Sequence, residues 1–318
     1  MRVLIVGSAG QDGRILWEQL QENGDELIGI TRQGVQSVPH SPRPAVDIFC
    51  ERGVQCLVED IAPERIYFLA AHHHSSEDRD SREGEIWNTS WRTHVEAFRN
   101  FLEAIRVTGL PARIFYASSS RVFGNPDVSP QNEETPVKPV CLYGVTKATG
   151  MMLARHYREM YGVWASCGIL YNHESRLRGR QFLSQRVAHG LVALKEGRET
   201  KLEIGNLEAR VDWGYAPDYT GAMRLILEAA LPGEFVIATG RTHSVREMIE
   251  VAADFLEFQY RDAVIENPAV LQRPPLSLCG DASRLQAATG WKPTQTFEGL
   301  IRHMVSAALE STSRRCPV

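Results

Sequence analysis

The sequence predicts an α/β fold in which a doubly wound parallel sheet carries a smaller C-terminal α/β unit. Two observations support this. Short β-branched or apolar runs alternate with amphipathic stretches through the first two thirds of the chain, and a glycine-rich turn joins the first run to the first amphipathic stretch. Strands separated by helices of this length form right-handed βαβ units, and helices then cover both faces of one parallel sheet.

The elements are expected in a definite order along the chain. The predicted strands of the sheet are Arg2–Val6, Glu26–Thr31, Arg65–Leu69, Arg113–Ala117 and Trp164–Leu170, and the helical patterns between them are Gly13–Gln21, Ile86–Thr108 and Gly144–Tyr161. Beyond residue 170 the expected elements are a helix over Phe182–Glu196, short strands near Lys201–Ile204 and Glu234–Ala238, and helices near Val245–Phe258 and Phe297–Leu309. We therefore expect one domain over residues 1–170 and a second mainly over 171–318, with chain crossovers back to the sheet.

Composition excludes several classes of function. The chain has 318 residues and a net charge of −4, so no basic field draws it to nucleic acid or to anionic lipid. No apolar run approaches the roughly 20 residues of a membrane span, and the first strand begins one residue after Met1, which leaves no room for a signal peptide. The six cysteines form no C-x-x-C pair, so we expect reduced thiols, no metal site and a cytoplasmic location. Consecutive residues such as His72, His73 and His74 cannot all face one ion.

The turn after the first strand has the spacing of a phosphate-binding loop. Gly7, Gly10 and Gly13 form G-x-x-G-x-x-G directly between a strand and a helix. Glycine lets the backbone turn sharply and approach a pyrophosphate, and the helix N-terminus supplies free N–H groups. Glycines also occur in ordinary tight turns, but the strand–turn–helix context favours a dinucleotide site.

The end of the second strand bears on the choice of cofactor. An NAD site usually places Asp or Glu there to bind the ribose 2′-hydroxyl, whereas Arg can pair with a 2′-phosphate. This strand ends in Thr31 followed by Arg32. We therefore predict NADP rather than NAD, with Arg32 as the phosphate partner, although an exposed and solvated arginine is the plain alternative. Asp47 and Ile48 fit an acid–apolar pair beside the adenine.

A tyrosine and a lysine one helical turn apart suggest redox chemistry at an alcohol or carbonyl. Tyr143 and Lys147 share one face of the predicted helix because they are spaced i, i+4. A neighbouring Lys charge is expected to lower the pKa of Tyr143 and to make it a proton donor and acceptor. The Y-x-x-x-K pattern alone is common by chance, but here it follows Ser118, Ser119 and Ser120 at the end of a strand.

With these motifs the chain resembles the extended short-chain dehydrogenases/reductases, a Rossmann-type family. Within them it is similar to GDP-mannose 4,6-dehydratase and to GDP-4-keto-6-deoxy-mannose reductase. The resemblance covers nearly the whole chain. Its matching stretches are Gly10–Gly13, Tyr67–Ala71, Ile169–Ser175, Gly205–Asn206, Asp212–Gly214, Asp218–Tyr219, Val236–Gly240, Ser244–Arg246 and Gly290–Pro293. Asn172-His-Glu-Ser175 is typical of the dehydratase branch, whereas Thr146–Ala148 and Asn206–Ala209 are similar to the reductase branch.

The resemblance implies a role for each matching residue. Tyr143 and Lys147 become the catalytic pair, and Ser119 becomes the residue that hydrogen-bonds the sugar O4. The further cofactor-binding residues that it implies are Gln11, Asp12, Leu69, Ala70, Ala71 and His173. The nucleotide-sugar residues that it implies are His74, Ser119, Ser120, Asn172, Glu174, Arg178, Arg180, Arg186, Asn206, Arg210 and Arg273. The physical argument agrees in part, because guanidinium groups suit bidentate contacts with a diphosphate.

The departures from the family pattern bear on the reaction. The dehydratases carry an acid two positions after the catalytic Ser/Thr, and Arg121 occupies that position here, so Arg121 joins the candidate catalytic set. Val211 replaces the usual Arg before Asp-Trp-Gly, and Leu276 replaces a usual Glu. His94 stands where many relatives have Asn.

Removal of water from C6 needs a group that takes the C5 proton, and a guanidinium stays protonated at any accessible pH. We therefore expect hydride transfer at C4 alone, as in a 4-keto-sugar reductase or a 4-epimerase of a GDP-hexose. Full dehydration is the alternative, with a histidine such as His74 as the substitute. A non-catalytic NADP-sensing regulator is a rival of another class, and a small-substrate alcohol dehydrogenase is a third. The resemblance also implies a homodimer or homotetramer.

Overall fold

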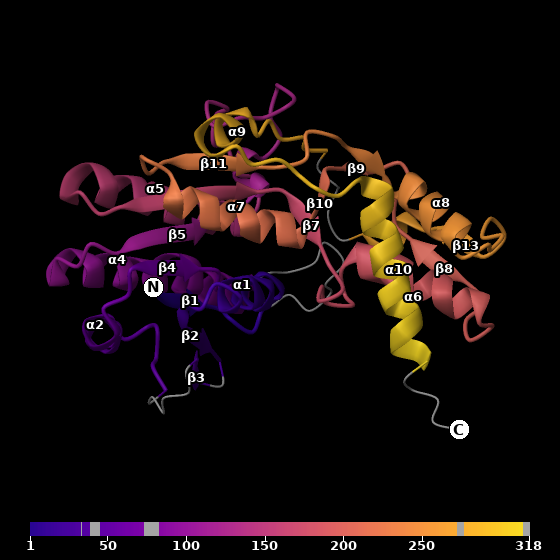
Figure 1. The fold of residues 1–318 in the computed structure, drawn as a ribbon. Coiled ribbons are helices and arrows are strands. Elements are labelled where there is room, and N and C mark those ends of the chain that lie inside the picture. Colours follow the sequence, from indigo (N-terminus) through magenta and orange to yellow (C-terminus); the bar gives the residue numbers. More distant parts are fainter. Residues whose placement is uncertain (33, 39–44, 73–82, 272–276, 314–318) are drawn as a thin grey trace.

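Seven strands form the larger sheet, in the order β11-β6-β5-β4-β1-β2-β3 (Figure 1). The structure is a computed structural model that describes residues 1–32, 34–38, 45–72, 83–271 and 277–313. The strands are β1 (Arg2–Val6), β2 (Glu26–Thr31), β3 (Gly34–Val38), β4 (Arg65–Phe68), β5 (Arg113–Ala117), β6 (Ala165–Leu170) and β11 (Glu234–Ile237). Neighbouring strands run parallel, except that β3 pairs antiparallel with β2 at one edge.

Helices cover both faces of this sheet. On one face α1 (Gln11–Gln21) contacts α7 (Ala216–Glu228), and on the other α2 (Glu51–Ile61), α4 (Ala97–Thr108) and α5 (Leu142–Tyr161) pack side by side. The strands are buried on both faces, which is why they read as continuous apolar runs and not as alternating patterns. The predicted doubly wound fold is therefore confirmed.

The order of the strands reverses between β1 and β4, because β2 and β3 lie on one side of β1 and the later strands lie on the other. The two strands lie side by side in register, with Val6 opposite Phe68. Ligands of doubly wound sheets bind outside the carboxyl ends of the strands at this point. The glycine turn follows β1, and residues 69–71 follow β4, so both segments line this crevice.

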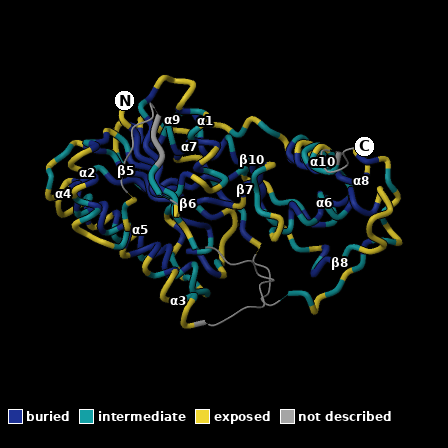
Figure 2. Tube along the Cα trace, turned by 90° about the horizontal axis from the view of Figure 1, so that it is seen from below, coloured by how far each residue is buried: buried dark blue, intermediate teal, exposed yellow. Residues whose placement is uncertain are grey.

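The part of the chain beyond residue 170 divides between two cores. Strand β11 and helix α7 belong to the core of the large sheet, and α9 (Ser283–Thr289) packs against both. A second core joins α6 (Leu183–Lys195), α8 (Val245–Phe255) and α10 (Phe297–Ser313) in the smaller unit, which lies beside the sheet in Figures 1 and 2. The short strands of this region are β7 (Asn172–Glu174), β8 (Leu202–Ile204), β9 (Arg210–Val211), β10 (Trp213–Tyr215), β12 (His243–Ser244) and β13 (Val264–Glu266).

Several elements differ from the sequence prediction, which did not include helices α7 and α9 or the short strands β7, β9, β10, β12 and β13. The helix predicted over Ile86–Thr108 begins earlier, as α3 (Glu83–Trp91), and passes into α4 through a π-helical turn, η1 (Arg92–Glu96). Helix α2 was missed, although Val54, Leu57, Val58 and Ile61 have helical spacing and are buried. Strand β3 was missed because polar residues interrupt its short apolar run.

Candidate active site

The glycine turn after β1 is closed by its own backbone. Gly7 has a φ of 95°, a conformation that side chains disfavour, and its N–H donates to the Ile30 carbonyl at 2.9 Å. A Cβ on Gly13 would lie 2.4 Å from the Gly7 carbonyl oxygen. The first turn of α1 therefore packs directly on the loop, and its N–H groups face the crevice where an anion would bind.

Residues 69–71 form the opposite wall of that crevice. The Leu69 N–H donates to the Val6 carbonyl at 2.9 Å, and a Cβ on Gly7 would lie 2.8 Å from the Ala70 nitrogen. The two backbones are thus in close contact.

The residues predicted to hold the adenosine end lie at the neighbouring strand end. Thr31 donates through Oγ1 to the Gly34 carbonyl at 3.1 Å, and Arg32 follows it, exposed. The exposed Asp47 accepts the Phe49 N–H at 3.0 Å. Ile48 is half-buried and packs against the main core. The end of β2 meets the glycine turn directly, because the Gly7 and Ser8 N–H groups both donate to the Ile30 carbonyl.

A buried ion pair joins the glycine turn to the smaller unit. His173 Nε2 lies 2.9 Å from Asp12 Oδ2, and His173 Nδ1 lies 2.7 Å from the Tyr171 carbonyl oxygen. Both partners only accept hydrogen bonds, so both ring nitrogens must donate and His173 is an imidazolium. Gln11 adds two links, because it donates to the His173 carbonyl at 3.2 Å and accepts from Ser175 Oγ at 2.9 Å.

The charges of this pair shift the pKa values of both partners. Burial alone would raise the pKa of Asp12 and lower that of His173. The attraction between the two charges and the hydrogen bond that joins them outweigh burial. The pKa of Asp12 is therefore lowered and that of His173 is raised.

The three consecutive serines after β5 lead into a short 3₁₀ turn, η2 (Ser120–Phe123). Ser119 caps this turn, since its Oγ accepts the Arg121 N–H at 3.3 Å. Ser119 and Ser120 are both buried, whereas Arg121 is half-exposed. The guanidinium of Arg121 lies near enough to Tyr143 to favour its phenolate.

Tyr143 and Lys147 occupy the first two turns of α5, as predicted. Lys147 is fully buried, and its Nζ donates to the Ala117 carbonyl at 2.7 Å. The same Nζ lies 5.6 Å from the centre of the Tyr143 ring. The structure thus places the lysine ammonium between the end of β5 and the tyrosine ring.

The expected lowering of the pKa of Tyr143 is wrong. Burial raises the pKa of this phenol, and the nearby charges of Arg178 and Arg121 offset that effect only in part. Burial also lowers the pKa of Lys147 to about 7, so this group carries only part of a charge at neutral pH. The i, i+4 spacing can be read from the sequence. The desolvation that dominates the pKa values of Tyr143 and Lys147 cannot.

The residues predicted for the nucleotide-sugar fall into two groups. Glu174 is buried and accepts from Ser184 Oγ at 2.7 Å. Arg178 lies 3.4 Å from the Glu174 carboxylate and stacks on the Phe182 ring at 3.7 Å. Asn172 and Arg180 are exposed. Arg178 is close enough to Asp12 and Tyr143 to lower the pKa of Asp12 and to offset in part the raised pKa of Tyr143.

The other predicted sugar residues lie on the smaller unit or outside the described part of the chain. Arg186 Nη2 donates to the Glu203 carbonyl at 2.8 Å, and Asn206 accepts the Glu208 N–H at 2.8 Å. Arg210 is held by Glu247 at 3.0 Å and by the Thr242 carbonyl at 2.8 Å. His74 and Arg273 lie outside the described residues.

The two acids that precede Tyr143 in the chain are held elsewhere. Glu133 accepts the Val236 N–H of β11 at 2.7 Å, and Glu134 pairs with Arg284 of α9. These contacts turn both carboxylates toward the edge of the sheet formed by β11 and α9. Neither is therefore available beside Tyr143.

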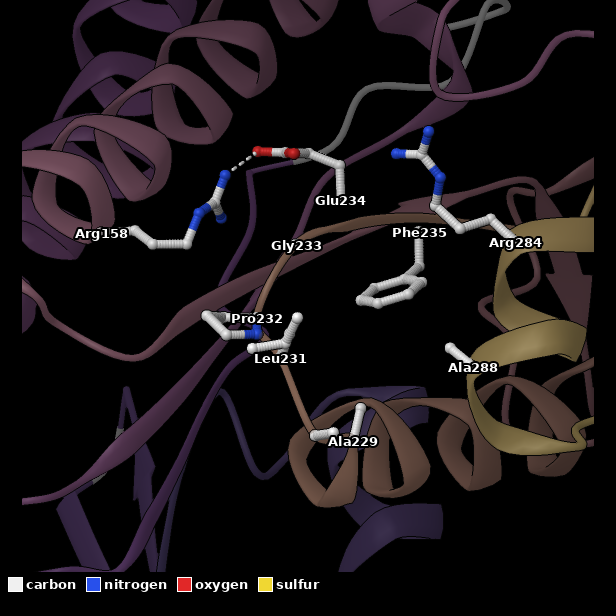
Figure 3. Close-up of a pocket in the computed structure, with 10 residues that line it drawn as sticks. Arg158, Ala229, Leu231, Pro232, Gly233, Glu234, Phe235, Arg284 and Ala288 are labelled. Atoms are coloured by element: carbon white, nitrogen blue, oxygen red, sulfur yellow. Dashed lines mark hydrogen bonds and ion pairs between the residues drawn. The ribbon is translucent and has the colours of Figure 1, made fainter.

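A cavity of about 440 Å³ lies at the opposite end of the sheet (Figure 3). It is lined by Arg158 of α5, the loop 229–233 before β11, and Arg284 and Ala288 of α9. Strand β11 begins here, so this cavity is at the amino ends of the parallel strands. Tyr143 and the glycine turn lie at the carboxyl ends.

Within the described residues, no helix is long and apolar enough to cross a membrane. No group of three metal-ligating side chains occurs there either.

Sequence reasoning missed the contacts that join separate segments at this site. Gln11 meets Ser175, and His94 meets Thr146 at 2.8 Å, although neither pair is close in the sequence. The only available signal was that His94 departs from the residue of many relatives. The partner of each side chain became evident only from the fold.

The chain is similar to known proteins over nearly its whole length. A family model described as GDP-mannose 4,6 dehydratase matches residues 4–304. "GDP-mannose 4,6 dehydratase 1" of Arabidopsis thaliana is 32% identical over 98% of this chain and 90% of its own length. The Vibrio cholerae and Cricetulus griseus proteins of that name are 31% and 32% identical over 96% of this chain, and over 93% and 91% of their own lengths.

Solved structures with lower identity share the fold. RMD from Pseudomonas aeruginosa, solved with NADPH, superposes with a TM-score of 0.81 at 22% identity, covering 97% of this chain and 99% of that chain. UDP-glucose 4-epimerase from Thermotoga maritima gives 0.82 at 20% identity, covering 98% and 100%. A Bacillus anthracis dTDP-glucose 4,6-dehydratase solved with NAD gives 0.81 at 18% identity, covering 98% of each chain.

Proposed function

We propose that this chain, which belongs to the GDP-mannose 4,6-dehydratase family of extended short-chain dehydrogenases/reductases, transfers hydride at C4 of a nucleotide-linked sugar without eliminating water. The reaction is that of a 4-keto-sugar reductase or a 4-epimerase. The observation that supports this choice is Arg121. It provides a permanent cation beside Tyr143, where the dehydratases of the resembled family have an acid.

The residues present fit a dinucleotide. Gly7 and Gly13 leave a cradle that a Cβ would fill, and the N-terminus of α1 opens onto it. When bound, the nicotinamide supplies or accepts the hydride. Tyr143 then gives a proton to the sugar O4 or takes one from it, Ser119 hydrogen-bonds the same oxygen, and Lys147, when protonated, favours the phenolate.

Elimination would need a base for the C5 proton, and the described acids near the site are engaged. Asp12 is paired with His173, and Glu174 with Ser184 and Arg178. Glu133 and Glu134 point to β11 and α9. Dehydration is the second candidate, because the curated relatives are named dehydratases and the resemblance makes Asn172–Ser175 typical of the dehydratase branch.

Product analysis separates the two reactions. The purified protein is incubated with GDP-mannose and NADP⁺, and the sugar is followed by proton NMR. Dehydration would create a methyl group at C6, which would contradict the proposal. In parallel, a GDP-4-keto-6-deoxy-hexose with NADPH should consume the cofactor as the 4-keto group is reduced. A reductase consumes NADPH in the second assay and leaves GDP-mannose unchanged in the first. A 4-epimerase converts the sugar in the first assay without producing a methyl resonance.

For the cofactor we propose NADP, with Arg32 bound to the 2′-phosphate. The support is an exposed guanidinium directly after β2, where an acid would be expected for NAD. Arg32→Asp should weaken NADPH binding and strengthen NADH binding, measured by quenching of tryptophan fluorescence. Equal affinities of the native protein for both cofactors would refute the assignment.

For the substrate we propose a diphosphate-linked sugar, with guanine as the base because the curated relatives are named for GDP-mannose. Arg178, Arg180 and Arg273 are the proposed diphosphate partners. Thermal shift with GDP-, UDP-, CDP- and dTDP-sugars in the presence of NADP tests the base, because a ligand of the folded state raises its apparent stability. Unchanged affinity after removal of these arginine charges would place the diphosphate elsewhere.

One variant discriminates between an enzyme and the rival function, a non-catalytic NADP sensor. Tyr143→Phe removes the hydroxyl that exchanges the proton but keeps the ring. An enzyme loses turnover and keeps NADPH affinity, whereas a sensor has no turnover to lose.

A further inference from the structure

His94 lies in the π-helical turn that interrupts the long helix before Tyr143. The turn spans Arg92–Glu96 and ends with the Ala97 N–H bonded to the Arg92 carbonyl. Such turns add a residue to the helix and are frequent at functional sites. Here the turn directs His94 into the protein, and its side chain is 0% exposed.

Both ring nitrogens of His94 have partners on other segments. Nε2 lies 2.9 Å from the backbone nitrogen of His72, and Nδ1 lies 2.8 Å from Thr146 Oγ1. A backbone N–H can only donate, so Nε2 must accept, and a neutral ring then carries its proton on Nδ1. The Thr146 hydroxyl oxygen accepts a hydrogen bond from this N–H, and its own O–H donates to the Tyr143 carbonyl at 3.1 Å or to the Leu142 carbonyl at 3.2 Å.

The hydrogen bonds therefore form a directed chain across the site. It runs from the His72 N–H through the His94 ring and the Thr146 hydroxyl to the first turn of α5. His72 directly follows residues 69–71, which form one wall of the crevice. The chain connects that wall to the helix that carries Tyr143.

The His94 ring also contacts Tyr143 directly. The two ring centres are 5.4 Å apart, and the planes are perpendicular. This edge-to-face arrangement is a favourable geometry for aromatic pairs. The main-chain carbonyl of His94 accepts from the Tyr116 hydroxyl at 3.1 Å, which holds the π turn against β5.

We propose that His94 is a positioning residue. Its ring, fixed in the Nδ1–H form between His72 and Thr146, holds the Tyr143 ring in the orientation that proton transfer to the sugar O4 requires. This role rests on the proposed function, because it concerns the same tyrosine and the same transfer. A smaller side chain such as Asn could keep a hydrogen bond but not the contact with the Tyr143 ring.

Variants of His94 separate its two contributions. His94→Phe keeps an aromatic ring but loses both hydrogen bonds, and His94→Asn keeps polar atoms but loses the ring. A misplacement of about 1 Å at a reacting group can cost roughly 100-fold in rate, so we expect kcat to fall about 10- to 100-fold in each variant with KM unchanged. Wild-type kcat in either variant would overturn the proposal.

Thr146 provides the test that does not depend on replacing a buried ring. Thr146→Val removes the hydroxyl and should lower kcat, and Thr146→Ser should restore it. Thr149→Val is the matched control, because Thr149 makes the same kind of bond to the Val145 carbonyl at 3.0 Å one turn along. It should keep the wild-type kcat. Equal loss in Thr146→Val and Thr146→Ser, or no loss in Thr146→Val, would overturn the proposal.

A measurement that does not depend on catalytic activity tests the positioning role of His94 separately from the proposed function. Nitrogen-15 NMR of the histidine rings, with His94→Asn used to assign the signal, should show a proton on Nδ1 and none on Nε2. A proton on Nε2, or on both nitrogens, would overturn the positioning role even in an active enzyme. An inactive wild-type protein with the expected Nδ1–H signal would contradict the proposed function and leave the hydrogen-bond chain confirmed.

Discussion

Lys147 shows how one buried group can make stability depend on pH. Burial lowers the pKa of its ammonium from 10.5 to about 7, so the folded chain binds fewer protons than the unfolded chain between these values. A lowered lysine pKa destabilises the fold most below the folded value. The destabilisation then fades as the pH rises toward the unfolded value.

Lys147→Met should reveal this dependence. The variant lacks the titrating group. As the pH rises from about 7 to about 10, the free energy of unfolding of the wild type should therefore increase relative to that of the variant. Urea denaturation at several pH values measures the difference. A difference that stays constant over this range would show that the ammonium is not desolvated. Turnover should be lost in the variant at every pH.

The ion pair between Asp12 and His173 acts between elements, because it ties α1 to β7. The raised pKa of His173 gives stability that is present below 6.5 and lost as the pH rises through the folded value. The lowered pKa of Asp12 gives stability that is present above 3.8 and lost as the pH falls through its folded value. The pair therefore stabilises the junction between these two limits.

Asp12→Asn should destabilise the protein by about 3 kcal/mol near pH 6, because it leaves a buried imidazolium without its partner. The loss should shrink at alkaline pH, where His173 is neutral in both proteins. Chemical denaturation at both pH values measures it. Glu247→Gln is the control, since this exposed carboxylate pairs with His243 at 2.8 Å on the surface and should contribute less than about 1 kcal/mol. Equal effects of the two substitutions would contradict the assignment.

Helix α1 packs so closely on the glycine turn that a side chain at Gly13 should disturb the cofactor site. Gly13→Ala places a Cβ 2.4 Å from the Gly7 carbonyl oxygen, so α1 must shift away from the crevice. Cofactor affinity should fall at least tenfold, as measured by fluorescence titration. Gly221→Ala is the matched control, because its Cβ meets nothing within 4 Å in helix α7. It should stabilise the protein by about 1 kcal/mol and keep cofactor affinity.

Some elements could be predicted from the sequence, and others could not, for identifiable reasons. Strands β1, β2 and β5 have the predicted bounds, because continuous apolar runs are a local signal. The π turn at Arg92–Glu96 has no such signal, since it differs from an α-helix by one residue. The pairing of Asp12 with His173 spans 161 positions and depends on the final fold. The pKa of Tyr143 was predicted in the wrong direction because desolvation is a property of the assembled core.

At the scale of the molecule, helices α4 and α5 present apolar side chains to solvent. They are linked by the Tyr157 hydroxyl, which donates to Glu103 at 3.0 Å. Val107, Met152 and Met160 are 46%, 56% and 66% exposed on the outer side of this pair. We propose that these helices form the homodimer face that the family resemblance implies.

Replacement of two of these methionines tests the dimer. Met152→Glu combined with Met160→Glu should convert a dimer to a monomer in light scattering after gel filtration, because like charges would face each other across a two-fold axis. Leu231→Glu is the control, since Leu231 is 76% exposed on the loop before β11. It should leave the mass unchanged. A wild-type monomer would contradict the proposal directly.

The place of β11 beside β6 has a consequence for how the protein is made. The ribosome releases the first six strands of the sheet well before residues 234–237 emerge, and helices α6 and α7 are synthesised in between. During that interval β6 is an open edge, and an unpaired strand edge is a template for association with other chains. The nascent chain must therefore stay protected through about sixty residues of further synthesis. A slow stretch of translation after β6 would prolong this exposed state, whereas one after β11 would not.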